Sequence, residues 1–211
     1  RVSGGSARIH DVTVRLPCDW VLREACRQQA AWQAAGLPPI TVAINISALQ
    51  FRKQGFVDRV REIIQNSGAE PRFLELELTE SALMQPTPET ETQLATLRGM
   101  GLGLALDDFG TGYSSLSYLK RLPLTHLKID RSFIRDLPGD TEDAAIATAT
   151  LSIARDLGLE VVAEGVETEA QRDFLLERQC QIMQGFLFAR PQPAANITRL
   201  LEAEAPASTR A

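Results

Sequence analysis

Short β-rich segments alternate with amphipathic helical segments along most of the chain, and this alternation constrains the fold more than any other feature. The expected strands cover residues 41–46, 73–78, 103–107, 125–129, 160–163 and 182–188. The expected helices cover residues 20–35, 56–68, 87 onward, 145–157, 168–175 and 194–202. Repeated β-then-α units are typical of a parallel sheet covered by helices.

Nearly every expected strand ends in a polar residue that apolar burial does not explain. These residues are Asn45, Glu77, Asp107 with Asp108, Lys128, Glu164 and Gln184. In a (β/α)8 barrel the carboxyl ends of the strands converge on one mouth, where catalytic residues gather, whereas an open sheet would scatter them along an edge. We therefore predict an α/β fold of the TIM-barrel type, with these side chains at its mouth.

The expected strands also direct charged side chains toward the barrel interior. In the segment 74–78, leucines alternate with Glu75 and Glu77, so the leucines would face the helices and the glutamates would point inward. His126 and Asp130 share an inward face in the same way. Because so polar an interior is costly unless its charges are compensated, we expect Glu75 and Asp130 to be structural ion partners and His126 to pack inward.

Four carboxylates and one amide oxygen would meet at the mouth, from Glu77, Asp107, Asp108, Glu164 and Asn45. Close carboxylates repel one another unless some are protonated or a cation neutralises them. Oxygen ligands without histidine or cysteine favour Mg²⁺ or Mn²⁺ over Zn²⁺. Four acids exceed what one Mg²⁺ takes, so we expect two ions, an arrangement that serves in-line hydrolysis of phosphodiesters. Lys128 would then lie at the rim and orient the attacking water.

The acidic composition limits the partners and the compartment. The chain has 22 lysines and arginines against 27 aspartates and glutamates, a formal net charge of -5, so it has no bulk attraction for duplex nucleic acid. Three widely spaced cysteines argue against a disulfide framework and favour the reducing cytoplasm. No apolar run is long enough to span a bilayer, although a longer parent protein with a membrane anchor elsewhere is compatible with this.

Six short motifs, taken in order and spacing, resemble the EAL-domain family of bacterial phosphodiesterases that linearise cyclic di-GMP. The motifs begin at Asn45, Glu77, Asp107, Leu127, Ala163 and Gln184. The most specific of them are Asp-Asp-Phe-Gly-Thr-Gly from Asp107 and Ala-Glu-Gly-Val-Glu from Ala163. The resemblance runs from about Trp20 to Pro191 and implies Mg²⁺- or Mn²⁺-dependent hydrolysis of cyclic di-GMP to linear pGpG.

The resemblance also assigns roles to single residues. It implies that the metal ligands are Asn45, Glu77, Asp107, Asp108 and Glu164, with Asp107 bridging the two ions. It implies that Lys128 holds the attacking water and that Gln184 supports the water or the substrate, so Lys128, Glu164 and Gln184 form the catalytic set. Glu80 would steady the loop 109–115, and Asp130 would support the ligands from behind. The resemblance further implies that the protein forms a homodimer through the barrel. It also implies that the parent protein carries a fused sensory or GGDEF domain.

One departure from the family concerns the beginning of the barrel. The Glu-Ala-Leu strand that names the family does not occur in this chain, and its expected place is upstream of Arg1. We therefore expect an N-terminally incomplete barrel over residues 20–203, preceded by a linker or atypical segment over 1–19 and followed by a flexible tail over 204–211. We expect this chain to bind metal and cyclic di-GMP more weakly than the parent protein and to hydrolyse little.

Two other functions stay open from the sequence. One is a catalytically silent receptor for cyclic di-GMP, as some family members with degraded metal motifs are. The other is an unrelated barrel lyase that forms a Schiff base on Lys128, which needs a desolvated lysine with a lowered pKa. Surrounding carboxylates should raise that pKa instead. The intact ligand set from Asn45 onward favours the phosphodiesterase.

Overall fold

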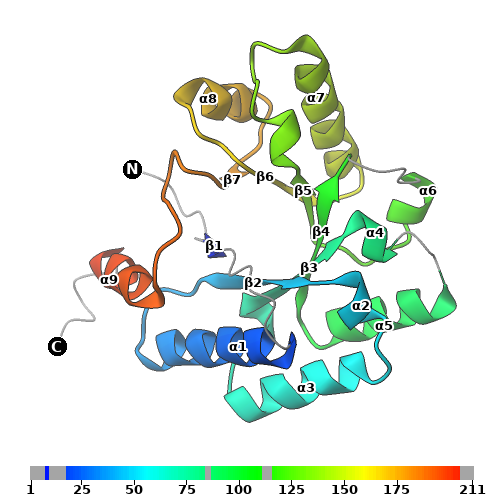
Figure 1. The fold of residues 1–211 in the computed structure, drawn as a ribbon, viewed down its shortest axis with the longest axis vertical. Helices are drawn as coiled ribbons and strands as arrows, with labels where there is room; N and C mark the ends of the chain where they lie inside the picture. The colour runs from blue at the N-terminus through cyan, green and yellow to red at the C-terminus, as the bar shows by residue number, and fades with distance from the viewer. Residues whose placement is uncertain (1–7, 10–17, 84–86, 111–115, 205–211) are drawn as a thin grey trace.

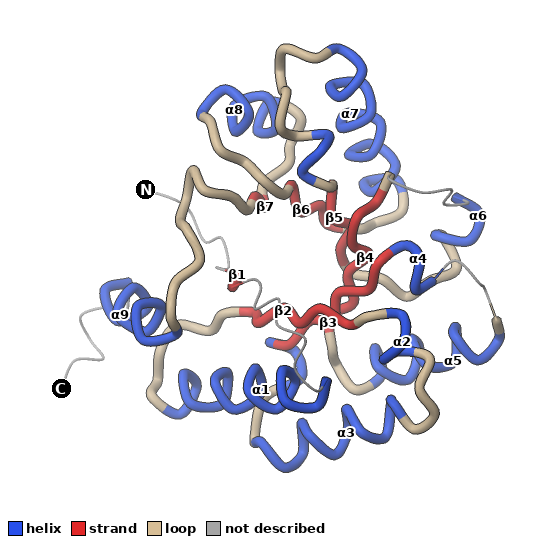
Figure 2. The backbone as a smooth tube through the Cα atoms, viewed as in Figure 1, coloured by secondary structure: helices blue, strands red, loops and turns tan. Residues whose placement is uncertain are grey.

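Seven parallel strands form one curled sheet in the computed structural model, which describes residues 8–9, 18–83, 87–110 and 116–204. Their spatial order is their order in the sequence, and each strand pairs with the next in parallel. The strands are β1 Arg8–Ile9, β2 Thr41–Ile46, β3 Leu74–Thr79, β4 Gly103–Phe109, β5 His126–Ile129, β6 Glu160–Ala163 and β7 Ile182–Met183. Figure 2 shows the strands as a curved row enclosed by helices.

The helices cover the outside of this curved sheet (Figure 1). They are α1 Cys18–Ala34, α2 Ala48–Phe51, α3 Phe56–Ser67, α4 Glu80–Leu83, α5 Pro88–Gly99, α6 Leu116–Leu119, α7 Thr141–Asp156, α8 Glu169–Glu177 and α9 Ala194–Glu204, with 3-10 turns η1 Pro71–Phe73 and η2 Arg131–Phe133. A curled parallel sheet with outer helices confirms the predicted α/β fold of the TIM-barrel type. Within the described residues, the outermost strands β1 and β7 do not pair with each other.

The core forms because the strands and the helices bury the same leucine-rich layer. Leu74, Leu76 and Leu78 of β3 are fully buried, and so are the two glutamates between them. Helix starts follow the predicted capping signals: Thr87 caps α5 ahead of Pro88, and Thr168 forms a capping box with Gln171 at α8. These local signals mark where α5 and α8 begin.

The last strand is shorter than the sequence predicts, because β7 ends at Met183 and does not continue to residue 188. The backbone beyond it bonds to the loop after β6: the Val166 N–H donates to the Gln184 carbonyl at 2.9 Å, and the Leu187 N–H donates to the Val166 carbonyl at 3.1 Å. A Cβ at Gly185 would lie 2.0 Å from the Val166 carbonyl oxygen. The glycine therefore lets two backbones meet where a strand residue with a side chain could not, and the chain turns.

The predicted division of the chain stays a prediction at both ends. Residues 1–7 and 10–17 of the proposed N-terminal segment lie outside the described residues, as do residues 205–211 of the proposed tail. The described parts of these regions are β1, which pairs with β2 through Ile9 and Val42, the start of α1, and the end of α9.

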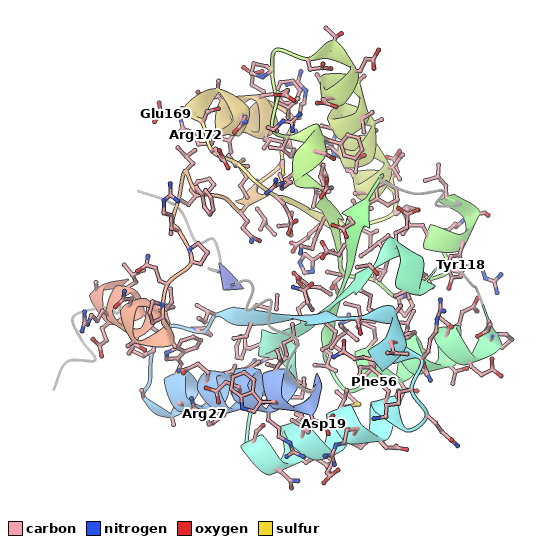
Figure 3. The ribbon with its side chains drawn as sticks, viewed as in Figure 1. Asp19, Arg27, Phe56, Tyr118, Glu169 and Arg172 are labelled. Carbon is pink, nitrogen blue, oxygen red and sulfur yellow. The ribbon has the colours of Figure 1, made fainter. Side chains whose placement is uncertain are left out.

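Exposed ion pairs on the outer helices contribute little to the stability of the fold. Asp19 of α1 pairs with Arg59 of α3 at 2.8 Å, and Arg172 pairs with Glu169 within α8. Figure 3 labels Asp19, Arg172 and Glu169 on the periphery of the molecule. Pairs this exposed contribute about 0–1 kcal/mol each. Among the described helices, none combines the length and the hydrophobicity needed to cross a membrane.

Cys26 and Cys180 are expected to resist thiol reagents in the native protein. Both side chains are buried, and burial raises the pKa of each thiol to about 11, so almost no reactive thiolate is present at pH 8. Labelling with a chromogenic disulfide reagent should therefore be slow for these two residues before unfolding and complete in guanidinium. Rapid native labelling of either residue, identified by peptide mapping, would contradict the burial.

Candidate active site

Strand register brings the predicted polar residues to one end of the sheet. Asn45 on β2 lies opposite Glu77 on β3, and Thr79, at the end of β3, lies opposite Asp107 on β4. Lys128 is the third residue of β5. Glu164 directly follows β6, and its N–H donates to the carbonyl of Ile129 in β5 at 3.2 Å. The carboxyl ends of consecutive strands therefore present these side chains to the same mouth.

Lys128 lies at the centre of the cluster and not at its rim as predicted. Its Nζ is 2.9 Å from Glu77 Oε2, 2.9 Å from Asp107 Oδ1 and 2.7 Å from Glu164 Oε1. The side chain can be buried because three carboxylates, on β3, on β4 and directly after β6, compensate its charge. The rim position expected from the sequence is therefore wrong.

The surrounding carboxylates decide the protonation state of Lys128. Burial by itself lowers the pKa of the lysine, but the charges of Glu77, Glu164 and Asp107 outweigh burial and raise this pKa above its usual value. A lysine held as an ammonium ion is no nucleophile, so the cluster argues against the Schiff-base lyase.

The cluster carries more negative charge than the lysine neutralises. One ammonium group faces three carboxylates, and the Asp108 carboxylate lies close enough to interact with Asp107, Lys128 and Glu77. Burial raises the pKa of Glu164, with the Asp107 charge acting in the same direction. Burial and the Asp107 charge raise the pKa of Asp108 as well. Both shifts show that the negative charge here is unfavourable without a further cation.

Asp108 has a left-handed backbone conformation that the sequence analysis did not predict. Its φ is 56°, and its N–H donates to Asp107 Oδ1 at 3.1 Å. The pairing of β4 with β5 is irregular between Leu106 and Phe109, which frees this residue from the regular ladder. Such a conformation costs a non-glycine residue about 1 kcal/mol. The signal in the sequence is weak. Aspartate tolerates the left-handed region better than most residues, and a glycine lies two positions further on. That glycine, Gly110, also has a positive φ, 97°.

Gln184 and Glu80 each bring polar atoms without a hydrogen-bond partner among the described residues. Gln184 directly follows β7 and donates its N–H to the Ala163 carbonyl at 2.8 Å, while its side-chain Oε1 is buried and unsatisfied. Glu80 is the first residue of α4, is 5% exposed, and has both carboxylate oxygens unsatisfied. The loop that Glu80 is predicted to steady includes residues 111–115, which lie outside the described residues.

The predicted structural ion partners occupy two different places. Fully buried Glu75 contacts Nδ1 of His126, and Glu160 contacts Nε2 of the same ring at 2.8 Å, near the amino ends of the strands. This confirms Glu75 as a structural partner, while His126 bridges two carboxylates in addition to packing inward. Asp130 instead caps η2 through the Ser132 N–H at 2.9 Å, and its charge contributes to the raised pKa of Asp108.

The residues at the mouth fit Mg²⁺ or Mn²⁺ by donor chemistry and by charge. The candidate ligands are all carboxylate or amide oxygens. Gln184, which directly follows β7, adds a further oxygen acceptor, because its Oε1 is buried without a hydrogen-bond partner among the described residues. In the described part of the chain, however, no three histidine, cysteine, aspartate or glutamate side chains are arranged to hold an ion directly. The Lys128 ammonium instead stands among the carboxylates.

A cavity of about 420 Å³ lies between α1, β2 and the segment after β7. Its lining includes Trp20 and Trp32 from α1, Val42 to Ile44 from β2, and Gln184 to Phe186. It therefore separates the residues from Val42 to Ile44 of β2 from the chain that follows β7.

Two curated relatives are similar to most of this chain. The bifunctional diguanylate cyclase/cyclic di-GMP phosphodiesterase MucR of Pseudomonas aeruginosa is 50% identical over 179 residues, which cover 85% of this chain and 26% of MucR. The cyclic di-GMP phosphodiesterase NbdA of the same organism is 49% identical over 185 residues, covering 88% of this chain and 24% of NbdA. The chain thus spans about a quarter of the length of these relatives.

Solved structures and a family model agree with these relatives. The MucR phosphodiesterase in complex with cyclic di-GMP has a TM-score of 0.82 at 50% identity, covering 85% of this chain and 72% of that one. The Klebsiella pneumoniae BlrP1 manganese/cyclic di-GMP complex has a TM-score of 0.71 at 31% identity, covering 82% of this chain and 45% of that one. The family model described as EAL domain matches residues 8–191. The chain therefore belongs to the EAL domain family.

Proposed function

We propose that this chain is the catalytic part of a metal-dependent phosphodiesterase that hydrolyses cyclic di-GMP to linear pGpG. The observation that carries the proposal is the convergence of Glu77, Asp107 and Glu164 on one mouth, where their oxygens lie 2.7–2.9 Å from Lys128 Nζ. Two relatives named as cyclic di-GMP phosphodiesterases, about 50% identical to this chain, support the choice of substrate. Hydrolysis to pGpG breaks one phosphodiester: water oxygen bonds to phosphorus, and the ribose 3′ oxygen leaves.

In this proposal two Mg²⁺ or Mn²⁺ ions would be held by Asn45, Glu77, Asp107, Asp108 and Glu164, and Asp107 would be shared between them. The ions supply positive charge that polarises the phosphodiester and offsets the excess of carboxylates. The need for a further cation is supported by the all-oxygen donor set and by the raised pKa values of Glu164 and Asp108.

The protein side chains position the water and its proton. Lys128 orients the attacking water through its ammonium group, and Gln184 directs its otherwise unsatisfied Oε1 at the water or the substrate. Glu164, whose pKa burial raises, is suited to accept the proton of the water. Asp130 is proposed to support the ligands from behind, where it caps η2, and Glu80 to steady the loop 109–115 with its buried carboxylate.

The full-length protein is proposed to close the barrel with a further strand. The cavity between β2 and Gln184–Phe186 has the position that an additional parallel strand would occupy, and β1 reaches only Thr41 and Val42 of β2. A strand bearing Glu-Ala-Leu there would add an anionic ligand at the mouth. We propose that the chain without it binds metal and nucleotide more weakly, since the loss of even an indirect support of a metal site costs about 10–100-fold in affinity.

The proposed biological context is a cytoplasmic signalling protein that acts as a homodimer through the barrel. A sensory or GGDEF domain would be fused to it, which is supported by the chain spanning about a quarter of the relatives' length and by the bifunctional name of MucR. Cyclic di-GMP, and not duplex nucleic acid, is the proposed partner, in keeping with a net charge of -5.

Incubation of the full-length protein with cyclic di-GMP, followed by chromatography of the products, tests the proposal. We expect pGpG to form with Mg²⁺ or Mn²⁺, to stop forming after chelation, and to be inhibited by Ca²⁺. Hydrolysis that survives chelation would overturn the metal assignment. Binding of cyclic di-GMP without any product under all of these conditions would identify the receptor instead. The 211-residue chain, assayed alongside, should show weaker binding and little turnover.

A further inference from the structure

The three N–H groups of the Lys128 ammonium match three carboxylates in number and distance. A lysine ammonium has three donors and no acceptor, and Nζ lies within 2.9 Å of one oxygen each of Glu77, Asp107 and Glu164. The side chain is 3% exposed, so water contributes little to the hydration of this charge. The lysine ammonium therefore lies where a bound metal cation would otherwise neutralise the negative charge of the same carboxylates.

We infer that Lys128 is a built-in counter-ion that competes with the divalent metal for Glu77, Asp107 and Glu164. In the metal-free protein it holds the three carboxylates together, and it gives up at least one of these ion pairs when an ion binds. The inference rests on the proposed function, because it takes the mouth to be a metal site.

Electrostatics gives the direction of the effect. Mg²⁺ takes oxygen ligands at about 2.0–2.1 Å, so an ion on the same oxygens would lie within a few ångströms of Nζ. Two like charges at that separation in a buried site repel strongly. The lysine therefore weakens metal binding, although it stabilises the metal-free fold by compensating carboxylates that would otherwise be buried without a cation.

Two aspartates flank this cluster, and the histidine of β5 lies away from it. Asp108 and Asp130 add negative charge. His126, the other cationic candidate of β5, faces Glu75 and Glu160 at the amino ends of the strands. Replacing Lys128 by a neutral residue should thus leave a site with more net negative charge and without the ammonium group that contacts these three carboxylates.

Calorimetric titration of the metal-free chain with MnCl₂ and with MgCl₂, without nucleotide, tests the inference. We expect Lys128→Met to bind the ions at least about tenfold more tightly than the unaltered chain. Its Tm should be lower without metal and should rise more on metal addition. Lys120→Met, at an exposed lysine beside α6, is the matched control and should change neither quantity. A purely structural role would lower the Tm without tightening metal binding.

The outcomes separate this inference from the proposed function. Equal or weaker metal binding by Lys128→Met overturns the competition while leaving the metal site intact. If neither the unaltered chain, nor its variants, nor the full-length protein binds either ion, the proposed metal site itself is overturned. If Lys128→Met does not fold without metal, NMR spectra of the lysine ammonium groups in the unaltered chain decide the question. We expect the protected Lys128 signal to shift or to lose its protection at saturating Mg²⁺, and an unchanged signal would contradict the competition.

Discussion

Replacing Glu164 by glutamine is expected to lower kcat for cyclic di-GMP hydrolysis by about 10³-fold in the full-length protein. Glutamine has the same shape and keeps an oxygen toward Lys128, which lies 2.7 Å from Glu164 Oε1, but it neither accepts a proton nor carries charge. Calorimetric affinity for cyclic di-GMP should fall far less, because the lost interaction belongs to the attack on phosphorus more than to ground-state binding.

Glu160→Gln is the matched control for this experiment. Glu160 begins the same strand that Glu164 follows, and it is exposed and pairs with His126 at the opposite end of β6. Its replacement should leave kcat within about twofold, because surface pairs of this kind contribute little even to stability. A Glu164→Gln protein with the unaltered rate would remove Glu164 from the catalytic set.

The largest effect on stability is expected from Gly185→Ala. An added Cβ would lie 2.0 Å from the Val166 carbonyl oxygen and 2.3 Å from the Val166 nitrogen, so two backbones would have to separate. We expect the free energy of unfolding to fall by about 3 kcal/mol or more, at the upper end of overpacking costs. Urea unfolding followed by circular dichroism measures this. Activity should fall as well, because the displaced segment carries Gln184.

Gly99→Ala provides the comparison within the same fold. Gly99 ends α5, its φ is not left-handed, and a Cβ there would meet nothing within 4 Å. The change should be neutral or should stabilise the protein by up to about 1 kcal/mol, since alanine is the better helix former. Equal destabilisation by the two substitutions would mean that the backbones at Gly185 and Val166 can move apart at little cost in free energy.

Features set by local sequence could be predicted, and those set by contacts between distant segments could not. The strand at 41–46, the cap at Thr87 and the capping box at Thr168 depend on neighbouring residues and are as expected. The early end of β7 depends on the contact between Gly185 and Val166, which are nearly twenty positions apart in the sequence. The residues around Gly185 do not predict that contact.

The candidate site shows the same division. Polar residues at the ends of the expected strands were enough to predict that Glu77, Asp107, Lys128 and Glu164 meet at one mouth, and the three carboxylates do contact the lysine. The burial of Lys128 among them depends on how four strands are staggered, which the sequence of any one strand does not contain. The left-handed Asp108 arises where the pairing of β4 with β5 breaks, and it was missed for the same reason.

The order of the strands has a consequence for synthesis. Because each strand pairs with the next one along the chain, the sheet can grow in the direction in which a ribosome releases it. Glu77 and Asp107 then emerge before Lys128, and Glu164 emerges last of the four. A nascent chain that has released only β1 to β4 holds two carboxylates destined for burial without their ammonium partner, which disfavours early closure of the sheet. When β5 has been synthesised, Lys128 removes that penalty. Burial of Glu77 and Asp107 is therefore expected to follow the synthesis of Lys128 and not to precede it.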